Sequence, residues 1–266
     1  MRLTVIGCSG STSGPDSPAS SYLVQAPYQG RTYSLVLDLG PGAFGRLWAQ
    51  LDPREVDAIA LTHLHPDHCL DLCAFYVGAR YSPTAPWAPV PVLGPSGTRE
   101  RIVRAYEVTA PGVVDPEPGP GIGEHFGYRD WRPEQRLGPF VVETVRVDHP
   151  VETYALRVTG DGPGGGTLVY SGDTGPCPAL VELARDADLL LAEAAFLDRP
   201  GNPTGLHLSG REAAETAAAA GVRRLVLTHI PPWHDPDRVL AEAAPHYQGP
   251  IELARSACSW TVGARP

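Results

Sequence analysis

Three histidines and an aspartate fall within one short stretch, HLHPDH, at residues 63–68. The apolar run VDAIALT, at residues 56–62, comes directly before it and has the composition of a buried strand. Alternate side chains of an extended segment point the same way, so His63 and His65 can bind one ion together. Packing alone does not explain such a concentration of ligand-type side chains, and the run therefore predicts a metal site at a strand end.

The last residues of the run lie where the chain turns into a helix. Pro66 suits the first helical position, because its fixed φ matches the helix and its missing N–H has no partner there. Asp67 and His68 then stand on the first turn and can bind a second ion near the first. Imidazole and carboxylate ligands together suit Zn²⁺, Mn²⁺ or Fe²⁺.

Short apolar strands bounded by glycine, proline and serine alternate with helical patterns along the chain. The predicted strands span residues 3–7, 21–26, 33–40, 56–62, 140–147, 153–160, 166–172, 187–194 and 223–229. The predicted helices span residues 41–51, 96–107, 176–185 and 209–221. The last helix has a serine cap, a glutamate three residues later and a closing glycine. The clusters of polar residues follow strands, which is where open α/β sheets place their sites.

The 266 residues, of which 42% are apolar, are enough for one large α/β domain over residues 1–266. Proline and glycine are concentrated between residues 82 and 123, which favours semi-rigid loops over an independent domain. Two interpretations of these loops stay open: a lid or substrate wall, and a plain surface excursion.

Composition narrows the classes of partner and compartment. The net charge is −9 and all 21 basic residues are arginine, which argues against a broadly basic surface for nucleic acid. The N-terminal apolar stretch is too short for a signal peptide, and no apolar run approaches the roughly 20 residues of a membrane span. The five cysteines include no CxxC pair, which favours a reducing compartment. We therefore expect a cytoplasmic protein that does not enter a membrane.

THLHPDH resembles the signature of the metallo-β-lactamase superfamily, and that family's other motifs occur in order. Asp38, at a strand end, resembles the buried aspartate of the first motif. The further matches are His149 in VDHP, Asp173 in YSGDTG and His229 in VLTHI. The resemblance implies an αββα four-layer sandwich, with two mixed sheets flanked by helices, and a centre of two divalent ions.

The resemblance also assigns the ligands of the two ions. They are His63, His65 and His149 for the first ion, Asp67, His68 and His229 for the second, and Asp173 as the bridge. Apart from His207, the remaining histidines are His125, His234 and His246. They do not follow strands, and we expect them at the surface or in structural roles. Of these three, His234 can line the pocket.

A glutamate and a histidine narrow the reaction. Glu193 ends a predicted strand, and His207 stands in GLHLSG just before a predicted helix. The phosphodiesterase branch of the family, which includes the tRNA 3′-processing endonucleases, has such a pair. The resemblance implies that His207, oriented by Glu193, is a general acid or stabilises phosphate, while a hydroxide held between the ions attacks phosphorus. The resemblance further implies that Asp67 and Asp173 are catalytic residues in addition to being metal ligands.

Within this branch the chain is most similar to the actinobacterial atypical class II cyclic-nucleotide phosphodiesterases. The matching stretches are GCSGSTSGPDSPASSYLV, THLHPDHCLDL, YSGDTG, LHLSG and LTHIPPW. The resemblance implies hydrolysis of 3′,5′-cyclic nucleotides such as cyclic AMP, or of small phosphodiesters generally. It also implies that the protein is a homodimer and that a Ser/Gly loop, from Ser9 to Ser20, borders the active site. Thr174 and the backbone amides of residues 172–175 can help to position the active site.

Other functions explain parts of the pattern. A tRNA 3′-endonuclease, with nucleic acid as substrate, would carry a Lys/Arg-rich arm that this sequence lacks, and commonly has glycine where Pro66 stands. A secreted β-lactamase would carry a signal peptide, and a glyoxalase-II-like thioesterase would have Gly-Gly where Cys69 and Leu70 follow the run. A metal-binding sensor without catalysis would explain the ligands but not the Glu193–His207 pair.

Overall fold

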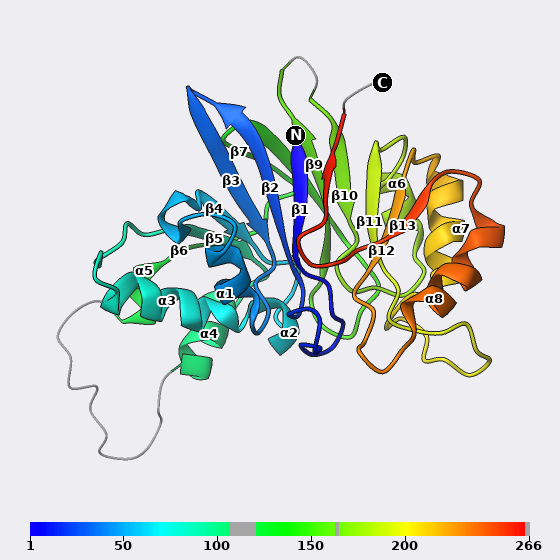
Figure 1. Ribbon diagram of the computed structural model, residues 1–266, viewed down its shortest axis with the longest axis horizontal. Coiled ribbons are helices and arrows are strands. Elements are labelled where there is room, and N and C mark those ends of the chain that lie inside the picture. The colour runs from blue at the N-terminus through cyan, green and yellow to red at the C-terminus, as the bar shows by residue number, and fades with distance from the viewer. Residues whose placement is uncertain (107–120, 163–164, 264–266) are drawn as a thin grey trace.

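Two seven-stranded sheets pack face to face, with helices on the outer face of each (Figure 1). The computed structural model describes residues 1–106, 121–162 and 165–263. In spatial order, the first sheet contains β14 (Ser259–Thr261), β1 (Arg2–Gly7), β2 (Ser21–Tyr28), β3 (Arg31–Leu37), β4 (Ala58–Ala60), β5 (Pro91–Gly94) and β6 (Gly127–Asp130). The second contains β13 (Ile251–Leu253), β12 (Leu225–Thr228), β11 (Leu189–Glu193), β10 (Thr167–Tyr170), β9 (Tyr154–Gly160), β8 (Phe140–Arg146) and β7 (Glu134–Leu137).

Both sheets are mixed, as expected. In the first sheet β1, β2 and β3 are antiparallel neighbours, and the strands from β3 to β6 run parallel to one another. In the second sheet β7 to β10 are antiparallel, and β10 to β13 are parallel. The parallel strands of each sheet end at the same edge, which is the edge where α2 lies in Figure 1.

Helices cover the outer faces. On the first sheet lie α1 (Ala43–Trp48), α2 (Pro66–Cys69), α3 (Asp71–Tyr81), α4 (Thr98–Tyr106) and α5 (Ile122–His125), and on the second lie α6 (Pro178–Leu183), α7 (Gly210–Ala220) and α8 (Pro236–Ala243) (Figure 1). The predicted capping box of α7 is present, because Ser209 accepts from the Glu212 amide and the Glu212 side chain accepts from the Ser209 amide. Gly221 closes this helix at φ 65°, a left-handed conformation that glycine adopts without strain.

Three apolar layers follow from this stacking. In β3, Leu35 and Leu37 belong to the core between the sheets, whereas Val36 belongs to the core beneath the helices of the first sheet. A third core, which includes Leu190 of β11 and Ala213 of α7, lies under the helices of the second sheet. Because both faces of the strands are buried, their sequences are continuously apolar rather than alternating.

The proline-rich region corrects one sequence expectation. Pro91–Gly94 forms β5 inside the first sheet, and Trp87, just before it, is buried against Phe75. Residues 82–90 are a largely exposed loop, as the composition predicts, whereas residues 91–94 form a strand inside the sheet that was not predicted. The predicted helix at 96–107 is α4 as far as the structure describes it, and residues 107–120, the rest of the possible lid, lie outside the described residues.

Several short elements had no clear sequence pattern. The strands β6, β7, β13 and β14 and the helices α5 and α8 were not predicted. Residues 163–164, between β9 and β10, lie outside the described residues, and the two strands pair antiparallel. Within the described ranges, no helix has the length and apolar character that crossing a membrane requires.

Candidate metal centre

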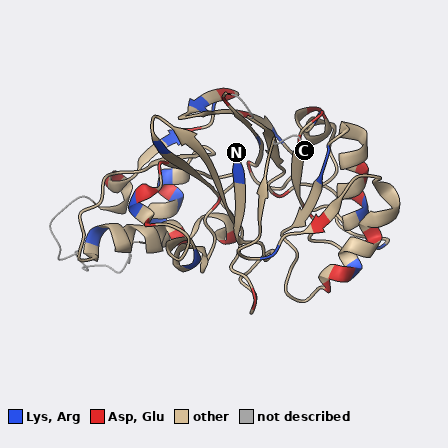
Figure 2. Ribbon diagram, turned by 45° about the horizontal axis from the view of Figure 1, so that its top comes forward, with Lys and Arg blue, Asp and Glu red and all other residues tan. Residues whose placement is uncertain are grey.

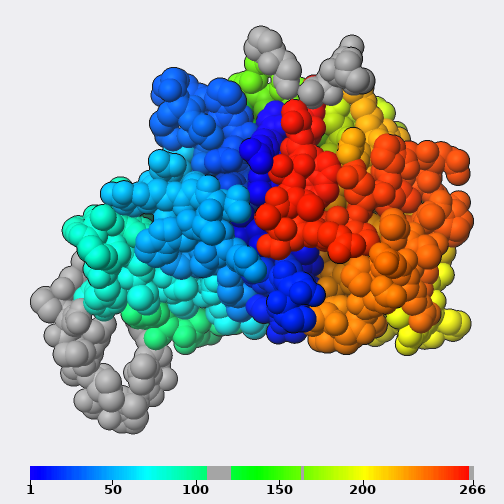
Figure 3. All heavy atoms as spheres, in the orientation of Figure 1, coloured from blue at the N-terminus to red at the C-terminus, as the bar shows by residue number. Residues whose placement is uncertain are grey.

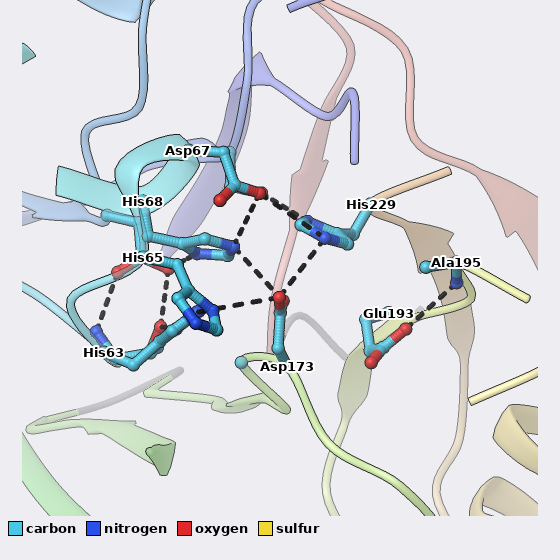
Figure 4. A network of polar contacts seen from close by, with 12 residues as sticks. His63, His65, Asp67, His68, Asp173, Glu193, Ala195 and His229 are labelled. Carbon is cyan, nitrogen blue, oxygen red and sulfur yellow. Dashed lines mark hydrogen bonds and ion pairs between the residues drawn. The ribbon is translucent and has the colours of Figure 1, made fainter. Parts of the chain in front are cut away.

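The predicted ligands come together at the shared edge of the two sheets, and Figure 4 labels all of them except His149. The first sheet contributes the HLHPDH run, which follows β4 and enters α2. The second sheet contributes His149 after β8, Asp173 after β10 and His229 after β12. Residues that are far apart in sequence thus meet because strands from both sheets end there.

The first group consists of His63, His65, His149 and Asp173. His65 Nδ1 lies 3.1 Å from His63 Nε2 and 3.2 Å from His149 Nε2. His63 Nε2 lies 3.6 Å from Asp173 Oδ2. Three imidazole nitrogens and a carboxylate oxygen therefore point at one another, which is the arrangement that a tetrahedral metal site needs.

The second group consists of Asp67, His68, His229 and the same Asp173. Asp173 lies 3.2 Å from His68 Nε2 through Oδ1 and 3.3 Å from His229 Nε2 through Oδ2. Asp67 Oδ2 lies 3.4 Å from His68 Nε2 and 3.7 Å from His229 Nε2. Because Asp173 belongs to both groups, it occupies the position of a bridge between two ions.

Two buried atoms show that these residues fit metal ions. His68 Nε2 and Asp173 Oδ1 are buried, and neither makes a hydrogen bond. Buried polar atoms without partners are rare and costly in folded proteins. The two atoms lie 3.2 Å apart without forming a hydrogen bond, and a divalent cation between the imidazole and carboxylate lone pairs would satisfy both.

The other nitrogen of four ligand rings is held by a neighbouring group. The contacts are His68 Nδ1 with Asp38 Oδ2 at 2.8 Å, His63 Nδ1 with Thr62 Oγ1 at 3.1 Å, His229 Nδ1 with Ser20 Oγ at 2.8 Å, and His149 Nδ1 with the Leu206 carbonyl at 2.8 Å. Such contacts fix the orientation of each ring and turn its Nε2 atom toward the centre.

Asp38 is the centre of a buried network beneath the second group. It is fully buried and accepts hydrogen bonds from the Thr62 amide and hydroxyl, from His68 and from the Tyr170 hydroxyl. Asp38 has a φ of 54°, so its carboxylate reaches these donors from a left-handed backbone conformation that aspartate tolerates. The predicted buried aspartate therefore orients His68 rather than binding an ion itself.

The charges of the centre suit metal binding. Burial lowers the pKa of His63, His65, His149 and His229, and so favours the neutral imidazole that a metal requires. Burial alone would raise the pKa of Asp173, but His229, His68 and His63 outweigh it and hold that pKa well below its usual range. Asp173 is therefore an anion.

His68 differs from the other four histidines. Burial disfavours its charged form, but the carboxylates of Asp173 and Asp38 outweigh burial and raise the pKa of His68 well above its usual range. The pocket around His68 thus favours a positive charge, which a divalent ion would provide in place of the proton.

Glu193 and His207 lie beside the two groups. His207 Nδ1 is 2.8 Å from Glu193 Oε1 and 4.0 Å from Asp173 Oδ2. Glu193 is fully buried and also accepts hydrogen bonds from the amide of Thr174 and from the amide of Ala195, the second of which Figure 4 shows. Burial acts to lower the pKa of His207, but Glu193, with Asp173, outweighs it and raises that pKa to about 9.

The Ser/Gly loop borders the centre as expected. Its end, Ser20, holds His229, and the Ser11 amide lies 3.4 Å from His229 Nε2. Sequence reasoning did not identify Thr62, Ser20, Tyr170 or the Leu206 carbonyl as groups that orient ligands. The one sequence feature that could have pointed to such a role is that two predicted strands end in Thr-His, at Thr62–His63 and at Thr228–His229.

The remaining histidines do not join the centre. His125 is buried and packs against Tyr76 and Phe126, and His246 is exposed with Nδ1 3.4 Å from Glu215. His234 lines a cavity on the other side of the loop that carries His229. Thr174 acts through its amide, which donates to Glu193.

Comparisons with known proteins identify the family. Residues 33–230 match the beta-lactamase superfamily domain. An uncharacterized protein of Mycobacterium leprae is 44% identical over 266 residues, which cover 99% of this chain and 89% of that protein. YhfI of Bacillus subtilis, a probable metallo-hydrolase, is 30% identical over 98% of this chain and 99% of its own. Ribonuclease Z of Myxococcus xanthus is 30% identical over 96% of this chain and 95% of its own.

Solved structures share the fold. The crystal structure of YhfI superposes with a TM-score of 0.80 at 26% identity, covering 97% of this chain and 98% of that one. Human tRNase Z, short form, gives a TM-score of 0.74 at 22% identity, covering 99% of this chain and all of the other, 100%. The chain therefore belongs to the beta-lactamase superfamily and has the metallo-β-lactamase fold. It is a metal-dependent hydrolase.

Proposed function

We propose that the protein is a phosphodiesterase whose substrates are 3′,5′-cyclic nucleotides, such as cyclic AMP, or small phosphodiesters of the same kind. The observation that carries the proposal is the Glu193–His207 pair, because it places a protonated imidazole beside the two groups of ligands. A metal-binding sensor would need the ligands but not this pair.

The ligands would hold two divalent ions, for which Zn²⁺ is the best match to this set of imidazoles and carboxylates, with Mn²⁺ or Fe²⁺ also suited. Bound there, the ions would supply Lewis acidity and a water of lowered pKa. Asp173 would belong to both ion sites, and Asp67 to the second.

His207 has the protonation state and position of a general acid. Its pKa of about 9 keeps it protonated at neutral pH. Glu193 accepts a hydrogen bond from His207 Nδ1, so His207 Nε2 is the atom that can donate a proton to the departing oxygen of a phosphodiester. Glu193 is itself fixed by two backbone amides, so the imidazole is held in one orientation before substrate binds.

Surface charge supports a small substrate. Figure 2 shows acidic and arginine residues interspersed over both layers of the fold rather than gathered into one basic tract. With a net charge of −9, such a surface gives little general attraction for a polyanion. Because both sheets contribute ligands, the chain is proposed to act as one domain; a homodimer and a cytoplasmic location are further expectations of the same proposal.

One alternative has an observation in its favour. The ribonuclease Z of Myxococcus xanthus is 30% identical over nearly the whole chain, and a ribonuclease cleaves the phosphodiester bonds of RNA. Cleavage of a tRNA precursor at its 3′ trailer is therefore the second candidate function.

The experiment is a substrate panel. The purified protein, treated with a chelator and reloaded with Zn²⁺ or Mn²⁺, is assayed with bis-p-nitrophenyl phosphate, cyclic AMP and a tRNA precursor. We expect metal-dependent turnover of the first two. Cleavage of the precursor alone would establish the nuclease instead, and stable metal binding without any turnover would establish a sensor.

A further inference from the structure

A cavity of about 340 Å³ lies behind the metal ligand His229. The two sequence neighbours of this ligand, Thr228 and Ile230, line the cavity, whereas His229 itself points to Asp67 and Asp173. Ser9 also lines it and forms a bridge with Ile230. The volume is within the range of about 300–1,000 Å³ that is typical of small-molecule sites.

Three segments that are distant in sequence form the walls. They are the loop after β1, the loop between β12 and α8, and the residues that follow β13, and their regions of the chain meet on the face seen in Figure 3. Much of the lining is apolar and comes from Ile230, Pro231, Pro232, Leu253 and Ala254. Flat, rigid proline surfaces of this kind suit a planar ring.

A buried hydroxyl in the cavity has no partner. Ser9 is only 5% exposed, and its Oγ makes no hydrogen bond. The oxygen has almost no exposed surface, because Gly14, which also lines the cavity, packs against it: a Cβ at Gly14 would stand 3.1 Å away. A ligand reaches the hydroxyl only when the Gly14 segment moves aside. An unsatisfied hydroxyl is costly in the free protein, and a polar group of a ligand would relieve that cost.

Two charged side chains stand at the rim, on different walls. Arg255 and Asp16 line the cavity and are exposed. Neither makes an ion pair in the part of the chain that the structure describes. An unpaired guanidinium binds phosphate well, because its planar donors match the phosphate oxygens. The carboxylate of Asp16 can accept from a hydroxyl or an amino group.

We propose that this cavity is a second, non-catalytic site that binds a nucleoside monophosphate. The phosphate contacts Arg255, the base packs on the proline surfaces, and hydroxyl or amino groups bind Ser9 and Asp16. The choice of this ligand rests on the proposed function, because hydrolysis of a 3′,5′-cyclic nucleotide adds water across one P–O bond and yields a nucleoside monophosphate.

The site would act on the metal centre through Gly10. The Gly10 amide donates to the Ile230 carbonyl at 3.2 Å, and a Cβ at Gly10 would stand 2.9 Å from His229 Cδ2. The strip between the cavity and the metal ligand is therefore tightly packed. A ligand that binds against Ser9 and Ile230 would also restrict the movement of His229, and so increase the affinity of the second ion site for metal. By thermodynamic linkage, metal bound at that site would increase the affinity of the cavity for the nucleotide by the same factor.

The test is calorimetric titration of the metal-loaded protein with AMP. We expect two binding events, one at the metal centre and one at the cavity. Arg255→Gln should weaken the second event by about tenfold or more, because it removes a charge-assisted contact. The matched control is Arg46→Gln, which changes another exposed arginine without an ion pair in the described chain, and should leave both events unchanged. Equal titrations for the two variants would overturn the proposal.

Ser9→Ala gives a second test that folding defects do not obscure. It removes an unsatisfied buried hydroxyl, so the free protein should be as stable as wild type or more so, while AMP binding at the cavity weakens. The dissociation constant of the second Zn²⁺, measured with a chromogenic chelator, should fall when AMP is added to wild type but not to Arg255→Gln. No such fall would overturn the coupling.

Failure of the two proposals is distinguishable. A protein that hydrolyses no phosphodiester but binds AMP through Arg255 would retain the cavity site and lose the proposed function. A protein that hydrolyses cyclic AMP and binds AMP equally in Arg255→Gln and Arg46→Gln would retain the function and lose the cavity site.

Discussion

Replacement of Asp38 by asparagine should destabilise both the fold and the second ion site. The carboxylate accepts four hydrogen bonds, three of them on Oδ2, from Thr62 Oγ1, His68 Nδ1 and Tyr170, and one on Oδ1, from the Thr62 amide at 2.7 Å. An asparagine carries one acceptor oxygen. If that oxygen takes the place of Oδ2, the NH₂ group faces the Thr62 amide. Two hydrogen-bond donors then face each other, and the Thr62 amide has no acceptor.

The expected loss in the free energy of unfolding follows from these contacts. One buried donor without an acceptor costs about 1–3 kcal/mol, and the remaining bonds lose the strength that the charge gave them, about 1 kcal/mol each. We expect a loss of about 4–6 kcal/mol, which corresponds to a fall in Tm of roughly 10–20 °C for a chain of this length. Because Asp38 orients His68, affinity for the second ion should fall roughly 10- to 100-fold.

The assay is thermal unfolding followed by circular dichroism, with metal content by mass spectrometry. The matched control is Asp186→Asn, because Asp186 is exposed and has a φ of 55°, close to the 54° of Asp38. It loses the same charge from the same backbone conformation without the buried contacts, and its Tm should stay near that of wild type. If the two variants unfolded at the same temperature with the same metal content, the reasoning about Asp38 would be refuted.

The other predictions concern the ligands, the acid and the helix cap. Asp173→Ala should abolish hydrolysis and most metal binding, since the bridge is lost; two tightly bound ions in this variant would contradict that role. His207→Ala should slow turnover and keep both ions, and loss of metal would count against the acid role. Because the pKa of His207 is raised to about 9, wild-type turnover should decline as pH rises through that value, and Glu193→Gln should move the decline to lower pH; an unmoved profile would show that another group titrates. Ser209→Ala should cost about 0.5–2 kcal/mol of stability without changing metal content, as measured by urea unfolding.

The sequence alone predicted the strands that carry the candidate site and most of the residues that the structure brings together there. Apolar runs with helical or extended periodicity identify the elements, because each must bury a face. The HLHPDH run is recognisable because its six residues are adjacent and their spacing is fixed by a strand end and a helix start. The resemblance to a family then supplied His149, Asp173 and His229, which no local pattern assigns to the same centre.

Only the tertiary structure shows how these residues are held in place. Ser20 and Asp38 orient His229 and His68 across long sequence separations, and a serine or a buried aspartate has no local signature for that role. The strand β5 lies in a proline-rich stretch whose composition favours a loop, yet pairing with β4 and β6 outweighs local preference. The cavity behind His229 exists only because three distant segments close around it. Such features depend on contacts between distant residues, and those contacts form only when both sheets have assembled.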